Sequence, residues 1–295
     1  MIDLHMHTKY SDGTDSETEI LVRAQSKNLN CISITDHNTV DFYKKVKNIN
    51  ISDYYSGKIM VGVELNTKLL GVPIEILGYN FDWNLMRKKL PNLYISATER
   101  NKIEYSRLIK KCEEFGLHFS KEEINSYDYT CFSSKYIHKL ITNNPNYKSF
   151  FDEDAWNNSN IFYRKYMSNP GSHFYVEMDD IVPTFDIASN LIRECGGKVF
   201  IPHIYEYKDN STKILNDILN NYEIDGIECY YTTFTNEQSN YLLNICKERG
   251  LLVSGGSDYH GHNKPNVDVG TGFGNLVIPD NILNNWWIWY LHYFT

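Results

Sequence analysis

Residues 1–13 read MIDLHMHTKYSDG, and this stretch predicts the first strand of the fold together with the first ligands of a metal site. A short apolar segment ends in His5 and His7, and a turn built on Ser, Asp12 and Gly follows it. Because strand side chains alternate between faces, His5 and His7 project from the same side of the strand. Two imidazoles placed in this way can bind one metal ion, and Asp12 is close enough to join them or to serve a neighbouring ion.

The composition indicates a folded globular chain. Hydrophobic residues make up 42% of the 295 positions and charged residues 22%, which fits one large α/β barrel or two domains. The formal net charge of -8 argues against broad, sequence-independent binding of nucleic acid. A small phosphorylated substrate remains compatible with this charge.

Cysteine usage and the chain ends predict a cytoplasmic protein that does not enter a membrane. The six cysteines contain no C-x-x-C pair, and we interpret them as reduced core residues. The chain starts directly with a predicted strand, so no signal peptide is expected. The apolar tail at residues 286–295 is shorter than the about 20 residues of a membrane span, and we expect it to pack against the domain. A contact with another protein is the alternative for this tail.

The order of predicted elements favours an α/β barrel that is interrupted by a helical domain. Strands are predicted at residues 2–7, 31–35, 59–65, 74–81, 198–201, 226–231 and 251–254, and helices at residues 16–27, 184–195, 213–221 and 236–249. Strands separated by helices predict parallel pairing with right-handed crossovers. Residues 84–164 are instead polar and helical, with the longest helix expected at residues 96–114. We therefore expect a barrel formed by residues 1–83 and 165–285, with residues 84–164 inserted as a cap domain.

Residues of metal-ligand type recur at the carboxyl ends of the predicted strands, where parallel α/β folds build their sites. The seven residues are His7, Asp36, His37, Glu64, His203, Asp258 and His260. Any one of them could be an ordinary buried or capping residue, but seven at one end of successive strands favour a common site. Imidazoles and carboxylates packed together need compensating cations. Their mixture suits zinc, manganese or iron, so the pattern predicts a multinuclear metal centre.

The motifs at these positions resemble those of the PHP (polymerase and histidinol phosphatase) superfamily. They are DLHMHT at residues 3–8, SDG at 11–13, TDH at 35–37, GVE at 62–64, His203, and SDYH at 257–260. The resemblance is greatest to phosphoesterases that hydrolyse nucleoside 3',5'-bisphosphates or trim short RNA. It implies a distorted (β/α)7 barrel with a helical insertion domain, two or three divalent ions of manganese, zinc or iron, and a small phosphorylated substrate.

Carried over residue by residue, the resemblance implies three neighbouring metal sites. The ligands would be His5, His7, Glu64 and Asp258 for the first ion, Glu64 and His203 for the second, and Asp12, His37 and His260 for the third. Apart from the resemblance, strand alternation predicts that Glu75 also points into the metal site as a ligand, with a glutamate at the rim, hydrogen-bonded to the insertion, as the alternative. Asp36 would orient a ligand or a water, and Asp36, Asp258 and His260 are the predicted catalytic residues. The predicted substrate-binding residues are Arg100, Ser134 and Lys135.

The chain departs from this family pattern at three places. Glu75 stands where relatives have a histidine, and residues 133–136 read SSKY where relatives read GRPH. The Pro and Arg that usually follow His203 are replaced by the sequence IYEY. Two phosphate-binding groups are thereby replaced, and Lys135 is a candidate substitute. Glu228, at a strand end, leaves two interpretations open, because it could orient a ligand or be structural.

The expected reaction is hydrolysis of a phosphate monoester, from a nucleotide, a nucleoside 3',5'-bisphosphate or a short oligonucleotide, by a metal-activated hydroxide. One alternative is an amidohydrolase-like metal hydrolase, which also places His-x-His after a first barrel strand. The TDH motif and the closing Asp-x-His favour the phosphoesterase. A non-catalytic metal-binding protein with altered phosphate recognition is the other alternative.

Overall fold

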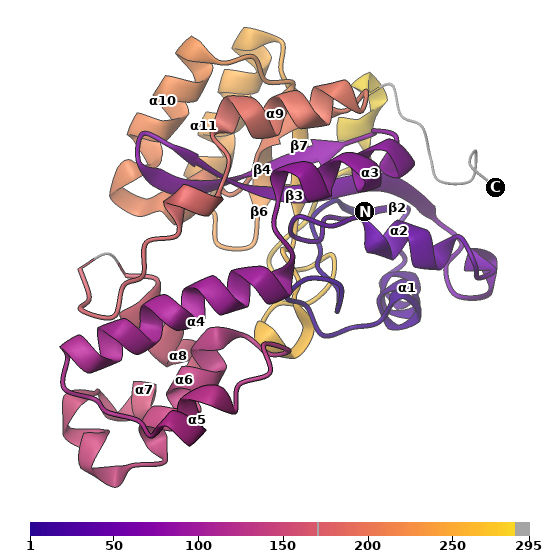
Figure 1. Ribbon diagram of the computed structural model, residues 1–295. Coiled ribbons are helices and arrows are strands. Elements are labelled where there is room, and N and C mark those ends of the chain that lie inside the picture. The colour runs from indigo at the N-terminus through magenta and orange to yellow at the C-terminus, as the bar shows by residue number, and fades with distance from the viewer. Residues whose placement is uncertain (170, 287–295) are drawn as a thin grey trace. The chain divides into compact units, whose positions relative to one another are not determined.

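The computed structural model describes residues 1–169 and 171–286, which form two compact units. The first, here called the barrel unit, comprises Met1–Leu93 and the chain from Val182 onward, and it contains the whole sheet. The second, here called the helical unit, is Tyr94–Ile181 (Figure 1).

The helical unit begins and ends later in the chain than the insertion expected at residues 84–164. Helix α3 (Trp83–Leu93) buries three apolar side chains and packs against α9 (Phe185–Glu194), so it belongs to the barrel unit. Phe174 and Val176 lie in the hydrophobic core of the helical unit. Because these two side chains are buried there, the helical unit extends past residue 164, where the polar stretch was expected to end.

The barrel unit is built on one seven-stranded sheet in which the strands follow one another in chain order. The strands are β1 (Ile2–Asp3), β2 (Cys31–Ile34), β3 (Lys58–Leu69), β4 (Val72–Tyr79), β5 (Lys198–Ile201), β6 (Gly226–Tyr231) and β7 (Leu252–Gly256). Each lies where the sequence predicts a strand, although β1 is shorter than the expected residues 2–7. Beyond β1, Met6 continues the pairing only as an isolated parallel bridge with Tyr259.

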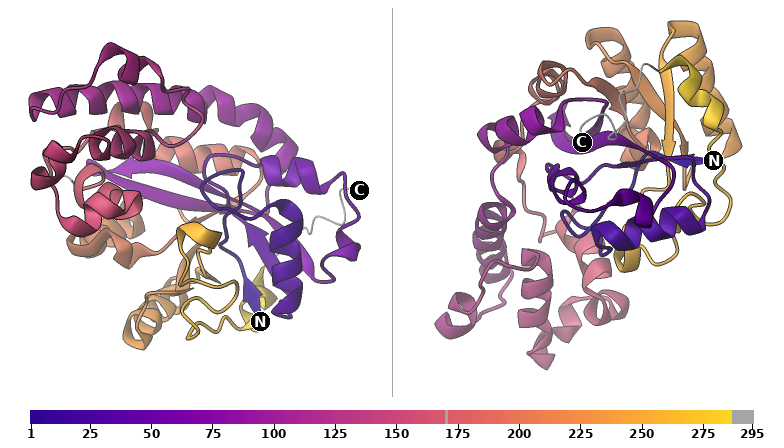
Figure 2. Two further views of the ribbon diagram at one scale, coloured as in Figure 1. Left: turned by 90° about the horizontal axis from the view of Figure 1, so that it is seen from below. Right: turned by 90° about the vertical axis from the view of Figure 1, so that its right-hand side faces the viewer.

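Contacts between the first and last segments bring the sheet close to a closed ring. The backbone nitrogen of His7 donates to the carbonyl of Tyr259 at 2.8 Å, just past the end of β7. The N-terminus lies beside the yellow segment near residue 280 (Figure 2), and the Met1 amino group pairs with Asp280 at 2.7 Å. The predicted distorted barrel of seven strands is therefore confirmed.

The direction of β4 contradicts the prediction that the strands pair in parallel. β4 is antiparallel to both β3 and β5, whereas the other strand pairs are parallel. A two-residue hairpin, Leu70 (φ 54°) and Gly71 (φ 74°), joins β3 to β4. Positive φ at both residues is the geometry of a type I′ turn. The first residues of β4 consequently lie at the same edge as the last residues of its neighbours.

Helices cover the outer side of this sheet. In the barrel unit they are α1 (Glu17–Ser26), α2 (Asp41–Val46), α3, α9, α10 (Ser211–Asn221) and α11 (Asn236–Arg249). Helix α9 packs against β3, β4 and β5, and α11 packs against β6 and β7. Ser16 and Glu19 form the predicted capping box at the start of α1. Gly250, with φ 68°, ends α11 in the left-handed conformation that glycine favours.

The core of the barrel unit extends to the last described residue. Trp286 is 6% exposed and stacks on Phe200, with ring centroids 4.6 Å apart. Tyr79 lies against both rings and donates its hydroxyl to the carbonyl of Leu4 at 2.9 Å. The start of the apolar tail thus packs against the domain, and residues 287–295 lie outside the described residues.

The helical unit consists of helices around its own core. They are α4 (Ala97–Glu114), α5 (Lys121–Asn125), α6 (Ser133–Thr142), α7 (Glu153–Asn157) and α8 (Ser159–Phe162). Short helical turns in the two units are η1 (Ile51–Asp53), η2 (Pro145–Phe150), η3 (Tyr163–Met167), η4 (Asp179–Ile181), η5 (Ile204–Asn210), η6 (Gly261–Asn263) and η7 (Asp280–Asn285). Across the part of the chain that the structure describes, no helix has the length and apolar character needed to cross a membrane.

Candidate metal centre

The predicted ligands converge at the edge of the sheet formed by the strand ends. Their ligand-capable atoms form three overlapping groups, each with all atoms within 4.8 Å of one another. The groups are His7, Asp12, His37 and His260; His5, His7 and Glu64; and His37, Glu64 and Glu75. His203 and Asp258 adjoin these groups through the contacts described below. All of these residues belong to the barrel unit.

The first expected site has two imidazoles facing two carboxylates. Glu64 Oε2 lies 3.2 Å from His5 Nε2 and 3.1 Å from His7 Nε2. Asp258 Oδ1 lies 3.4 Å from His7 Nε2 and 3.7 Å from His5 Nε2. His5 and His7, in the segment that follows β1, are fully buried. One oxygen of each carboxylate therefore faces the pair of ring nitrogens, an arrangement suited to a shared cation.

A second cluster forms around Asp12, which is carried by the turn after His7. Asp12 Oδ1 lies 3.2 Å from His260 Nε2 and 3.6 Å from His7 Nδ1, and its Oδ2 lies 3.8 Å from His37 Nε2. The rings of His7 and His260 are stacked with centroids 4.1 Å apart. The structure thus joins His7 to the three residues expected for the third ion.

Glu64 links these clusters to His203 and Glu75. Its Oε2 faces His37 Nδ1 at 3.4 Å, in addition to His5 and His7, whereas its Oε1 lies 2.9 Å from His203 Nε2. The two oxygens of one carboxylate therefore face different imidazoles. Such a division is what a bridging carboxylate between two cations requires.

Glu75 lies at this edge because β4 runs antiparallel to its neighbours. Its Oε2 is 3.5 Å from His203 Nε2, and its Oε1 is 3.9 Å from His37 Nδ1. The side chain is 30% exposed, so Glu75 is on the open side of the cluster. In a parallel strand, a residue this near the amino end would lie at the opposite edge.

Asp36 contacts the loop that carries two of the ligands. Its Oδ1 accepts hydrogen bonds from the Thr8 backbone nitrogen and from Ser11 Oγ, both at 2.7 Å, and its Oδ2 accepts one from Thr8 Oγ1 at 2.6 Å. Burial raises the pKa of the Asp36 carboxyl, and His7 and Thr8 act against that rise. The geometry gives Asp36 the task of holding the segment between His7 and Asp12 in place.

Four residues outside the predicted set support the ligands. Glu228, left open by the sequence, contacts His5 and the backbone of His203, while Tyr231 and Lys264 contact Asp258. Asp3 accepts hydrogen bonds from Ser257, through its backbone nitrogen at 2.9 Å and its hydroxyl at 2.6 Å. Of these four residues, the sequence pointed only to Glu228 as a residue that could orient a ligand. The contacts of the other three depend on how β1, β6 and the loop after β7 meet.

The buried charges and the ring nitrogens of the cluster fit bound cations. Burial opposes a charged His7, but contacts with Asp258 and Glu64 outweigh it and raise the pKa of His7 to about 10. The pKa of His203 is likewise raised to about 9, against burial, by Glu64. His7 Nε2, His37 Nδ1 and His203 Nδ1 are buried and make no hydrogen bond, although the first two face Glu64 Oε2. The carboxylates that raise these pKa values give the site an excess of negative charge. Divalent cations would offset that charge.

The predicted substrate-binding residues belong to the helical unit. Arg100 is exposed in α4, Ser134 is buried in α6, and the Lys135 ammonium lies 5.5 Å from the ring centre of Phe132. Their role in binding a substrate stays a prediction. His138, which the sequence did not assign as a ligand, contacts the carbonyl of Ala155 through Nε2 at 2.9 Å.

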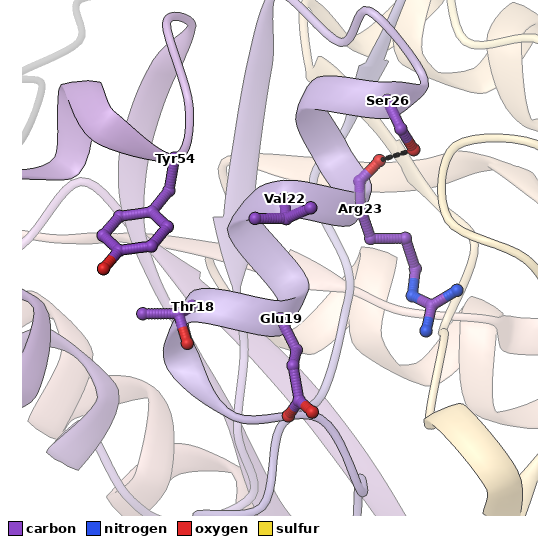
Figure 3. A pocket seen from close by; sticks show the side chains of 6 residues that line it. All are labelled: Thr18, Glu19, Val22, Arg23, Ser26 and Tyr54. Carbon is purple, nitrogen blue, oxygen red and sulfur yellow. Dashed lines mark hydrogen bonds between the residues drawn. The ribbon is translucent and has the colours of Figure 1, made fainter.

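A separate surface pocket lies along α1 and carries none of the predicted site residues. It is lined by Thr18, Glu19, Val22, Arg23, Ser26 and Tyr54 (Figure 3). The hydrogen bond within it runs from Ser26 Oγ to the carbonyl of Arg23 at 2.7 Å, which is an ordinary helix contact. We assign no function to this pocket.

Comparison with known proteins gives the chain a family context. The PHP domain family model matches residues 3–178. A 5'-3' exoribonuclease of Haemophilus influenzae is 26% identical over 264 residues, covering 88% of this chain and 89% of the relative. The 5'-3' exoribonuclease Rnm of Escherichia coli is 22% identical over 292 residues, covering 97% and 93% of the two chains.

Solved structures share the fold over nearly the whole chain. A candidate metal-dependent phosphoesterase from Bifidobacterium adolescentis has a TM-score of 0.69 at 20% identity, covering 96% of this chain and 94% of the other. An amidohydrolase from Chromobacterium violaceum has the same TM-score and identity, covering 95% and 92%. At this level of identity the two structures support the fold.

Proposed function

The chain belongs to the PHP domain family, and we propose that it is a metal-dependent phosphoesterase that hydrolyses a phosphate monoester of a nucleotide or of a short RNA. The observation that carries the proposal is the convergence of five imidazoles and four carboxylates at one edge of the sheet. These nine residues are His5, His7, Asp12, His37, Glu64, Glu75, His203, Asp258 and His260.

Within this proposal the nine residues would hold two or three divalent ions. Zinc, manganese and iron suit such mixed imidazole and carboxylate ligands. When bound, these ions would activate a water for attack on phosphorus and offset the negative charge of the phosphoryl oxygens.

Other side chains of the barrel unit fix the geometry of the ligands. Glu228 bonds to His5 Nδ1 at 2.9 Å, which leaves Nε2 facing Glu64 and Asp258. Asp36 holds the loop between His7 and Asp12, as its three hydrogen bonds to Thr8 and Ser11 indicate. Rigid support of this kind keeps ligands in position while substrate binds and product leaves.

The proposed substrate class draws on the relatives and on the charge of the chain. The relatives from Haemophilus influenzae and Escherichia coli are named 5'-3' exoribonucleases. A chain with a net charge of -8 lacks the overall positive charge that favours binding along an extended phosphate backbone. Recognition of one terminal phosphate group at the metal centre fits both facts.

The test is a hydrolysis assay on protein reconstituted with manganese, zinc or iron. The substrates are a nucleoside 3',5'-bisphosphate, a 5'-phosphorylated oligoribonucleotide and a sugar phosphate, with release of inorganic phosphate and of mononucleotide both recorded. We expect turnover of at least one nucleotide substrate, and its loss in Asp258→Ala. Release of ammonia from amides without phosphatase activity would favour the amidohydrolase alternative, and metal binding without any turnover would favour a non-catalytic role.

A further inference from the structure

We propose that Lys264 binds a phosphoryl oxygen of the substrate at the metal centre. This inference rests on the proposed function, since it assigns one contact of a phosphorylated substrate within the barrel unit. Lys264 follows the last predicted ligand, His260, by four residues, and the sequence motifs did not point to it.

The contacts of Asp258 place the Lys264 ammonium beside the ligand cluster. Asp258 Oδ1 faces His7 Nε2 at 3.4 Å, on the side of the candidate ions. Its other oxygen, Oδ2, accepts hydrogen bonds from Tyr231 at 2.6 Å and from Lys264 Nζ at 2.5 Å. The Asp258 carboxylate therefore lies between the Lys264 ammonium and the position expected for a cation.

The Lys264 side chain is also partly exposed. The Lys264 side chain is 28% exposed, whereas that of Asp258 is 7% exposed. A lysine ammonium has three donor hydrogens, and a contact with one carboxylate oxygen leaves donors for another acceptor. Phosphate oxygens are strong acceptors, and a lysine contacts them as a point charge.

The turn that carries Lys264 is fixed to the loop of Asp12. In η6, the backbone nitrogen of His262 donates to Thr14 Oγ1 at 3.0 Å, and Asn263 Nδ2 donates to the carbonyl of Asp12 at 2.7 Å. Gly261 has φ 62°, and a Cβ at this position would meet Thr14 Oγ1 at 2.0 Å. The turn is thus held against the loop of Asp12, so the backbone that carries Lys264 is positioned before any substrate binds.

Charge supports the same assignment. Among the described residues, Lys264 is the one lysine or arginine that forms an ion pair with a candidate ligand carboxylate. A phosphate group bound by the ions would carry further negative charge to this edge. Lys264 can offset that charge without displacing a metal ligand.

The rival explanation is that Lys264 only positions Asp258. Tyr231 contacts the same oxygen, so Tyr231→Phe is a matched control that removes one partner of Asp258 without removing a cation. The experiment compares Lys264→Met, Lys264→Arg and Tyr231→Phe with the wild type. Binding of inorganic phosphate to the metal-loaded proteins is measured by calorimetry, and metal content is measured by elemental analysis.

We expect Lys264→Met to weaken phosphate binding about tenfold or more with its metal content unchanged, because a hydrogen bond to a charged group is lost. Lys264→Arg should keep most of the affinity, and Tyr231→Phe should weaken phosphate binding only as far as it loses metal, because it removes a partner of Asp258 and no cation. Equal phosphate affinity in Lys264→Met and the wild type would overturn the proposal. So would a loss of metal that accounts for the weaker binding in both Lys264→Met and Tyr231→Phe.

The two levels of inference can fail separately. If the wild type binds phosphate through Lys264 but hydrolyses no phosphate ester, the proposed function is wrong and the binding role of Lys264 stands. If the wild type hydrolyses nucleotides and Lys264→Met does so with an unchanged KM and unchanged phosphate affinity, the assignment of Lys264 is wrong and the function stands.

Discussion

Glu228 Oε1 lies 2.9 Å from His5 Nδ1, so a carboxylate within β6 fixes the orientation of an imidazole that follows β1. The other oxygen of Glu228 accepts a hydrogen bond from the backbone nitrogen of His203 at 2.7 Å. His203 has φ 21° and ψ 48°, a left-handed conformation that is unfavourable for a residue with a Cβ. One buried carboxylate thus supports two candidate ligands, through the ring of His5 and the backbone of His203.

Glu228→Gln should weaken metal binding about tenfold or more, since loss of a residue that orients a ligand typically has this effect. The amide keeps the size of the side chain but loses the charge that favours the Nδ1–H form of His5. Titration against a competing chelator measures the change. Glu237→Gln, at an exposed position in the first turn of α11, is the control that should bind metal like the wild type. Equal metal affinity in Glu228→Gln and the control would assign Glu228 a structural role only.

Removal of the ions should abolish turnover and lower the melting temperature together. Ions that bind only the folded chain stabilise it by about 2.7 kcal/mol when their free concentration is 100 times the Kd. Chelator treatment followed by thermal unfolding and phosphatase assay measures both effects, and added manganese should restore them. Chelator presaturated with manganese is the control. Full turnover in excess free chelator would show that the hydrolysis does not depend on these ions.

Trp286→Ala should destabilise the barrel unit by about 3 kcal/mol or more, as truncation of a buried Trp typically does. Trp286 is 6% exposed and packs on Phe200 and Tyr79. Denaturant unfolding measures the loss, and Phe273→Ala, at a residue that is 56% exposed, should change the stability by less than about 0.5 kcal/mol. If the two variants are equally stable, Trp286 contributes nothing to the core.

The positions of the strands could be predicted from the sequence, whereas the direction of β4 could not. Apolar runs identify β3 and β4, but the polar residues Asn66 and Lys68 hide the last part of β3. The turn Leu70-Gly71 lacks the Asn-Gly or Asp-Gly pair that signals a type I′ hairpin. The gap between the predicted strands, residues 66–73, consequently carries no signal of a hairpin.

Ligands near strand ends could be proposed from the sequence because parallel strands of one sheet end at one edge. Lys264 could not, because its approach to Asp258 depends on the hydrogen bonds of η6 to Thr14 and Asp12. Sequence spacing does not encode which way a loop folds after the strand ends. The same reason applies to Tyr231, whose contact with Asp258 joins β6 to the loop after β7.

Glu75 provides the sharpest test of the metal centre, because its place there follows from the antiparallel direction of β4. Burial and the Glu64 carboxylate raise the pKa of Glu75. The ligand atoms of Glu64, Glu75 and His37 lie within 4.8 Å of one another. Two carboxylates so close repel each other unless a cation lies between them, and a cation there would make Glu75 a ligand.

Glu75→Gln should therefore weaken metal binding and lower turnover about tenfold or more, and Glu75→His should restore metal binding with a changed preference among metals. Elemental analysis after reconstitution and the phosphatase assay measure the two effects. Tyr207→Phe is the matched control, because the Tyr207 hydroxyl accepts a hydrogen bond from the backbone nitrogen of Glu75, at 2.8 Å, and its removal leaves the Glu75 carboxylate in place. A Gln variant with the metal content and turnover of Tyr207→Phe would place the Glu75 carboxylate at the rim, outside the set of ligands.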